Sequence, residues 1–185
     1  MNHIDLSSVL RQTVACELYS NLVTRPTGAA VRDEIERLLM DTCERTLTVI
    51  DFSQVSMIDF SCADEVIAKL LLRSAAEDPP HDAYFLFRGV TEEHWEAIEA
   101  VLERRGLALV LEQADGVRVV GPLPDDERRV WETVQRLGRV APTELADVLG
   151  ADEAAVQHAL EGLRRRRLVM QVGDDYIVVG AHRGG

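Results

Sequence analysis

The chain has 185 residues, of which 46% are apolar and 28% are charged, and its formal net charge is −12. This length can bury one core or two small ones, and the composition is that of a globular protein. Residues 1–122 contain 21 acidic and 11 basic side chains. Such an excess of negative charge repels phosphate groups, so this part of the chain is not expected to bind nucleic acid or an anionic membrane.

The three cysteines have no paired spacing, which predicts neither a disulfide framework nor a zinc site of the two-by-two kind. A reducing compartment is therefore expected. Residues 1–11 lack a basic start followed by an apolar stretch, and no run reaches the ~18 apolar residues that a membrane-spanning helix needs. These observations predict a cytoplasmic protein without membrane contact.

The first predicted helix covers residues 31–39, where apolar side chains recur at helical spacing. Pro26 is expected to restrict Arg25 to extended geometry, because the proline ring disfavours a helical residue before it. The cap of the helix is then expected at Thr27 and Gly28.

Strands and helices alternate over the following residues. The predicted elements are a strand at 47–52, a helix at 63–71, a strand at 83–87, a helix at 95–102, and strands at 107–111 and 117–120. The first strand is almost continuously apolar, as in a central strand covered on both faces. This alternation predicts an α/β layer with a mixed sheet. Residues 8–19 fit either a strand or a short helix.

Acids and hydroxyls gather where the first of these strands leads into a helix. The motifs are VIDFSQV (49–55), IDFS (58–61) and the helix start ADE (63–65). Over residues 20–122 they resemble the STAS and STAS-like domains, the family of anti-sigma factor antagonists in bacterial partner-switching circuits. A hydroxyl residue of this loop is the phosphoacceptor in that family, and by position the resemblance gives that role to Ser61. Phe60 and Cys62 depart from the family pattern of a small residue and a glycine.

Two roles are open for Ser61. Backbone N–H groups at a helix N-terminus stabilise a carboxylate or a phosphate, so Ser61 is predicted as either the phosphoacceptor or a plain N-cap. Asp59 would bind and orient that hydroxyl, or else order the loop. Asp51, at the strand end, is interpreted as a structural acid that accepts hydrogen bonds.

The surface that docks a partner is expected around the same turn. Its candidate residues are Asp59, Phe60, Cys62, Asp64 and Glu65. The helix dipole favours Asp64 and Glu65 in a first turn, where they would add to an acidic surface. Cys62 is either a redox-sensitive thiol or a buried packing cysteine, and the neighbouring acids favour the second interpretation.

A linker is predicted at residues 121–124 and divides the chain into domains at 1–122 and 123–185. After it we expect helices around residues 130–137, 143–149 and 156–163, then a hairpin of strands at 168–172 and 176–179. Residues 125–180 thus resemble the winged helix-turn-helix family, whose third helix usually reads DNA. The predicted fold class is α/β, a STAS-like mixed sheet with covering helices, plus a small C-terminal winged-helix domain. Residues 1–122 are expected to fold alone, because all strands of the sheet precede the linker.

The third C-terminal helix has a mixed surface. Its candidate nucleic-acid contacts are Gln157, His158, Arg164 and Arg165. Asp152 and Glu153 stand at its N-terminus and would meet phosphates with the wrong sign. The arginines of residues 164–167 also complement the negative end of the helix dipole. A protein contact or dimerisation is therefore the preferred role of this domain, and DNA is the less favoured partner.

No catalytic residue, metal site or cofactor is predicted. The five histidines are scattered, without ligand spacing on one helix. The chain has no Gly-rich phosphate loop and no Gly-x-Ser-x-Gly turn. A magnesium-dependent phosphatase site after Asp51 would need a second acid two residues on, where Ser53 stands.

These patterns predict a non-catalytic bacterial signalling protein. By the family resemblance, the unmodified surface near Ser61 would bind an anti-sigma factor or a histidine-kinase-like ATPase, and phosphorylation would release that partner. The alternative is a transcriptional regulator whose winged helix binds DNA while the STAS-like domain senses a signal or dimerises. A homodimer is compatible with both.

Overall fold

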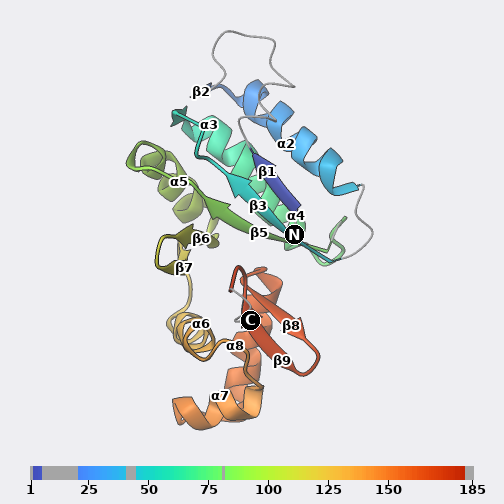
Figure 1. Ribbon diagram of the computed structural model, residues 1–185, viewed down its shortest axis with the longest axis vertical. Coiled ribbons are helices and arrows are strands. Elements are labelled where there is room, and N and C mark those ends of the chain that lie inside the picture. Colours follow the sequence, from blue (N-terminus) through green and yellow to red (C-terminus); the bar gives the residue numbers. More distant parts are fainter. Residues whose placement is uncertain (1, 6–20, 41–44, 81, 182–185) are drawn as a thin grey trace.

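A computed structural model of the protein describes residues 2–5, 21–40, 45–80 and 82–181. In these residues the chain forms a five-stranded sheet with the strand order β1-β3-β5-β6-β7 (Figure 1). The strands are β1 Asn2–Asp5, β3 Thr46–Asp51, β5 Ala83–Arg88, β6 Leu109–Gln113 and β7 Gly116–Val120. The first four are parallel, whereas β7 runs antiparallel to β6. The predicted α/β class with a mixed sheet is confirmed.

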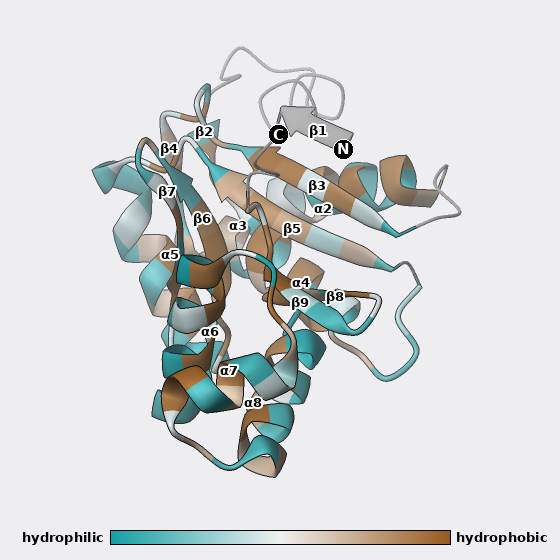
Figure 2. Ribbon diagram, turned by 60° about the horizontal axis from the view of Figure 1, so that its bottom comes forward, coloured by the Kyte–Doolittle hydropathy of each residue, from teal (hydrophilic) through white to brown (hydrophobic). Residues whose placement is uncertain are grey.

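Helices from the first two thirds of the chain cover one face of this sheet. They are α2 Arg25–Met40, α3 Phe60–Ala63, the π-helical turn η1 Asp64–Ala68, α4 Lys69–Ser74 and α5 Glu92–Arg105. The elements α3, η1 and α4 follow one another without a break. In Figure 2, α2 and α3 lie behind the sheet.

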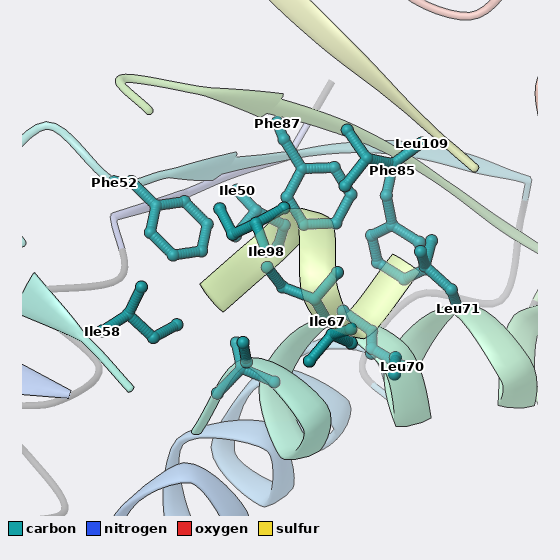
Figure 3. Packing of buried hydrophobic residues seen from close by; sticks show 14 of the residues in the cluster. Ile50, Phe52, Ile58, Ile67, Leu70, Leu71, Phe85, Phe87, Ile98 and Leu109 are labelled. Carbon is teal, nitrogen blue, oxygen red and sulfur yellow. The ribbon is translucent and has the colours of Figure 1, made fainter. Parts of the chain in front are cut away.

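The strands alternate between two buried faces. Phe85 and Phe87 of β5 point into the core under the helices, where Ile50 and Ile67 also lie (Figure 3). Tyr84, just before those phenylalanines, and Leu86, between them, are equally buried but belong to a second core on the opposite face. Successive side chains of a strand point to opposite faces, so the continuous apolar runs reflect a sheet that is covered on both sides.

The start of α2 differs from the prediction. The helix begins at Arg25, so this residue is helical rather than extended. Pro26 fits in the first turn, because the backbone N–H that proline lacks would have no helical partner there. Thr24 precedes the helix with a φ of 76°. The short parallel pair of β2 Asn21–Leu22 and β4 Met57–Ile58 was not predicted either.

Three helices and a hairpin follow the linker, in the predicted order. They are α6 Asp125–Leu137, α7 Pro142–Leu149, α8 Glu153–Arg165, β8 Val169–Val172 and β9 Asp175–Val178. Val140, between α6 and α7, forms an isolated antiparallel bridge with Tyr176 of β9. Trp131 of α6 is 1% exposed, and its Nε1 donates to the Leu168 carbonyl at 3.2 Å.

The second core joins residues on both sides of the predicted domain boundary. Tyr84 and Leu86 of the sheet belong to the same buried cluster as Trp131 and Leu160 of the C-terminal helices. After β9 the chain passes in front of the sheet in Figure 2, and a Cβ on Gly180 would come within 2.8 Å of the Leu86 side chain. The residues after the linker therefore cover the face of the sheet that α2, α3, α4 and α5 leave open.

Polar contacts reinforce this interface. The Arg167 guanidinium lies 4.9 Å from the centre of the Tyr84 ring, donates to the Ser74 carbonyl at 2.8 Å and pairs with Asp82 at 2.5 Å. Arg45 pairs with the same carboxylate at 2.8 Å and donates to the carbonyl of Gln171 in β8 at 2.8 Å. Arginines from both halves of the chain thus share Asp82, which places the hairpin next to the start of β5.

Among the described residues, no helix is both long and apolar enough to cross a membrane.

Candidate functional site

The strand β3 ends in a turn that Asp51 organises. One oxygen of its carboxylate accepts hydrogen bonds from the Ser53 backbone N–H at 2.9 Å and from the Ser53 hydroxyl at 2.5 Å, and the other accepts from Arg88 Nε at 2.9 Å. Burial favours the neutral acid, but the bonds from Ser53 and Arg88 outweigh it and lower the pKa of Asp51. Asp51 therefore has the structural role that the sequence indicated.

Asp59 is the N-cap of α3. Its carboxylate accepts from the backbone N–H of Cys62 at 2.8 Å and from that of Thr24 at 2.9 Å. Burial opposes ionisation, yet these bonds lower the pKa of Asp59 below its ordinary value. The Asp59 backbone N–H also donates to the Leu22 carbonyl at 2.9 Å. Asp59 thus ties the segment before α2 to the start of α3.

Ser61 lies in the first turn of α3, two residues after the N-cap Asp59. Because Asp59 holds the cap position, the alternative that Ser61 is the N-cap is wrong. The Ser61 side chain is partly exposed and hydrogen-bonds to the Asp59 carboxylate. A phosphoryl group on this hydroxyl would stand next to a carboxylate of the same sign of charge.

Two apolar residues that come shortly before Ser61 in the chain are open to solvent in part. Phe60 is partly exposed, and the Arg104 guanidinium of α5 lies 5.5 Å from the centre of its ring. Met57, in the strand β4 before α3, is 48% exposed. Exposed apolar side chains of this kind supply the contact area that protein interfaces need at their centre.

Cys62 lies beneath the surface. Its side chain is fully buried, and Sγ donates to the Thr24 carbonyl at 2.9 Å. Burial, together with the nearby Asp59 carboxylate, raises the pKa of Cys62 to about 12. The thiol therefore stays protonated at neutral pH, and the packing interpretation describes it better than the redox one.

Asp64 and Glu65 are placed inside the protein rather than on an acidic surface. Both are 2% exposed. Asp64 pairs with Arg25 of α2 at 3.1 Å and with Arg105 of α5 at 2.7 Å. Glu65 pairs with Arg25 at 2.6 Å and also with Arg32 and Lys69. Burial raises the pKa of each acid, but the hydrogen bonds from these cations prevail and lower it.

His94 anchors the loop between β3 and β4, a role that the sequence analysis missed. Its ring is fully buried, Nδ1 accepts from the Thr91 backbone N–H at 3.0 Å, and Nε2 lies 2.9 Å from the Val55 carbonyl. The ring is thus neutral, with its proton on Nε2. Thr91 and His94 have the spacing of a capping box, which is the signal that could have found this residue.

The stability of the protein should depend on His94 below pH 6.5. Burial lowers the pKa of His94 from its ordinary 6.5, so below that pH the unfolded chain binds a proton that the folded chain resists. The unfolding free energy should therefore fall as the pH falls, by up to about 1.4 kcal/mol per pH unit. In urea titrations from pH 7 to 5, His94→Gln should flatten this slope. The control is His158→Gln, which changes an exposed histidine and should leave the slope unaltered.

The nucleic-acid candidates on α8 are in part engaged elsewhere. Gln157 Nε2 lies 3.4 Å from the Tyr176 hydroxyl of the hairpin, while His158 is exposed. Arg164 and Arg165 both pair with Glu161 on their own helix, at 2.9 and 3.2 Å. Each arginine that would contact a phosphate therefore already has a carboxylate partner.

The next two arginines of the run face the rest of the protein. Arg166 pairs with Glu127 of α6 at 3.0 Å. Arg167 is 13% exposed and takes part in the interface with β5. Of the four residues 164–167, only Arg165 has most of its side chain in solvent, at 75%.

In the described part of the chain, no group of three or more His, Cys, Asp or Glu side chains is arranged to hold a metal ion. No protein-family model and no curated protein matches this chain.

Proposed function

We propose that this protein is a non-catalytic regulator that works by binding and releasing a protein partner at the start of α3, with phosphorylation of Ser61 as the switch. The observation that carries the proposal is the partly exposed Ser61 in the first turn of a helix whose cap, Asp59, already accepts from nearby backbone donors. The family resemblance of residues 20–122 supports an anti-sigma factor or a histidine-kinase-like ATPase as the partner.

A phosphate on Ser61 would change the docking surface without unfolding it. The group carries about −1.5 to −2 charges at neutral pH and lies near the positive end of the helix dipole, which stabilises it. It also lies beside the Asp59 carboxylate, next in the chain to the partly exposed Phe60 and four residues after the exposed Met57. A partner that packs apolar groups against those two residues would then have to desolvate a dianion.

The switch can be tested with Ser61 variants as bait for partners from cell extract. Ser61→Ala should keep the fold and retain the partner, because Asp59 rather than Ser61 caps the helix. Ser61→Asp should weaken the captured complex at least tenfold, since it places a charge in the contact area. Binding is measured by titration of the captured and purified partner.

Ser56→Asp is the matched control, because Ser56 is an exposed serine of the same loop outside the first turn of α3. It should bind as the wild type does. A partner that binds both Ser61 variants and the wild type equally well would refute the switch. Captured DNA without a protein partner would favour the regulator instead.

DNA binding is the weaker second candidate. The helices α6–α8 and the hairpin have the predicted order, and His158 is exposed on α8. However, the arginines of residues 164–167 are paired with acids or packed against the sheet. Phosphate contacts supply most of the affinity of non-specific DNA binding, and here they would require these pairs to break.

A further inference from the structure

A groove of about 570 Å³ lies between α5 and the edge strand β7, apart from the surface around Ser61. Trp95, Leu102 and Val120 form its apolar part, and Glu99, Glu103 and Arg118 form its polar part. The first residues of the linker close one end. The groove has the size of a typical ligand site.

The groove lies where the edge strand of the sheet meets α5. The strand β7 is the last in the strand order, and no described strand pairs with its outer edge. Val120 and Trp95 pack against the core under the helices but remain partly exposed. An edge strand with apolar groups in reach of solvent is a common docking place for an extended peptide.

The charges of the groove are not balanced by ion pairs. Glu99 and Glu103 are exposed and make no hydrogen bond or ion pair with another side chain of the described residues. Arg118 lies over the Trp95 ring, with its guanidinium 5.6 Å from the ring centre. A cation therefore already occupies the aromatic face, and two free carboxylates stand beside it.

We propose that this groove binds an extended segment of a partner protein that presents two arginines, two residues apart, with an apolar residue between or beside them. Four residues of helix rise about 6 Å, so Glu99 and Glu103 are spaced like alternate residues of a strand, about 6.6–6.8 Å apart. Two such arginines would each meet one carboxylate on α5, and the apolar residue, which points to the other side of the extended segment, would contact Val120 of β7. The two carboxylates repel phosphates, so a nucleic acid does not fit the groove.

The probe is the peptide acetyl-Leu-Arg-Val-Arg-Leu-amide, titrated while tryptophan fluorescence is followed. Trp131 is 1% exposed and lies in the second core, so a change on binding reports Trp95. Saturable binding is expected. The double variant Glu99→Gln/Glu103→Gln should weaken it about fivefold to tenfold, the range expected for two exposed ion pairs.

The matched control is Glu92→Gln/Glu96→Gln, which removes two exposed acids with the same spacing from the same helix but outside the groove. It should leave the affinity within about twofold of the wild type. Equal weakening by both double variants would show attraction to an acidic helix in general and would overturn the site. A peptide with adjacent arginines, acetyl-Leu-Arg-Arg-Val-Leu-amide, should bind less tightly than the alternating one.

The variant Arg118→Ala provides a separate test, because a purely structural role of Arg118 would not predict tighter peptide binding after its removal. The arginine competes for the Trp95 face and repels the incoming cation, so its removal should tighten peptide binding about threefold. Weaker binding to Arg118→Ala would contradict the proposal. Ser61→Asp should not change peptide affinity, so the failure of this site and the failure of the Ser61 switch can be told apart.

Discussion

Residues 1–122 expressed alone should aggregate or form a molten state, although the full chain folds. The reason is the second core: Tyr84, Leu86 and Val119 are buried in one cluster with Trp131 and other residues of the C-terminal helices. Exposure of a large apolar side chain costs about 1.5–3 kcal/mol. To uncover three of them would cost about 5–9 kcal/mol, which is the scale of the whole stability of a domain, about 5–15 kcal/mol.

This prediction differs from the expectation drawn from the sequence, which counted the strands before the linker but could not show what covers their second face. The measurement compares the fragment and the full chain by size-exclusion chromatography, by binding of a dye for exposed apolar surface, and by urea unfolding. Addition of the separate fragment 123–185 should restore cooperative unfolding. A fragment 1–122 that stays monomeric and unfolds cooperatively at the midpoint of the full chain would show that the second face needs no cover.

Glu65→Ala should lower the free energy of unfolding by about 3–5 kcal/mol, the range seen when a buried ion pair loses one partner. Glu65 is 2% exposed, and its partner Arg32 is only 15% exposed. Without the carboxylate, Arg32 keeps a charge that cannot reach water easily. Lys69 and Arg25, which are 39% and 51% exposed, can turn to solvent and add little to the cost.

Asp33→Ala is the control for this effect, because Asp33 pairs with the same Arg32 at 2.8 Å but is 66% exposed. Its loss should cost less than about 1 kcal/mol. Urea titration measures both variants, and the slope with denaturant should stay constant while the midpoint moves. Similar costs for the two variants would mean that burial of Glu65 does not set its contribution.

The ion pairs of Asp64 and Glu65 also predict how the free energy of unfolding changes at acidic pH. The pKa values of Asp64 and Glu65 are lowered below their ordinary 3.8 and 4.5, so the unfolded chain takes up protons before the folded chain does. Their contribution is complete above these ordinary values and is lost as the pH falls through the folded ones. Glu65→Gln should therefore reduce the loss of stability below pH 4.5, a range separate from that of His94.

Local sequence patterns predict the order and kind of most elements. The strands predicted at 47–52 and 83–87 are found at Thr46–Asp51 and Ala83–Arg88, and the hairpin turns at Gly173 and Asp174, as expected. Such features depend on repeats of the local backbone, since apolar side chains recur every second residue in a strand and every third or fourth in a helix. Neighbouring residues carry that information, so no knowledge of distant contacts was needed.

The tertiary structure alone decided the roles of single charged and polar residues. Asp64 and Glu65 appear in the sequence as ordinary acids near a helix start, but Arg25 and Arg105, about 40 residues away in either direction, enclose them in the fold. The arginines of residues 164–167 looked available for phosphate, yet Asp82 reaches Arg167 across 85 residues. The environment of a charge depends on which surfaces meet when the helices and the C-terminal segment pack on the sheet, and local sequence patterns do not contain that information.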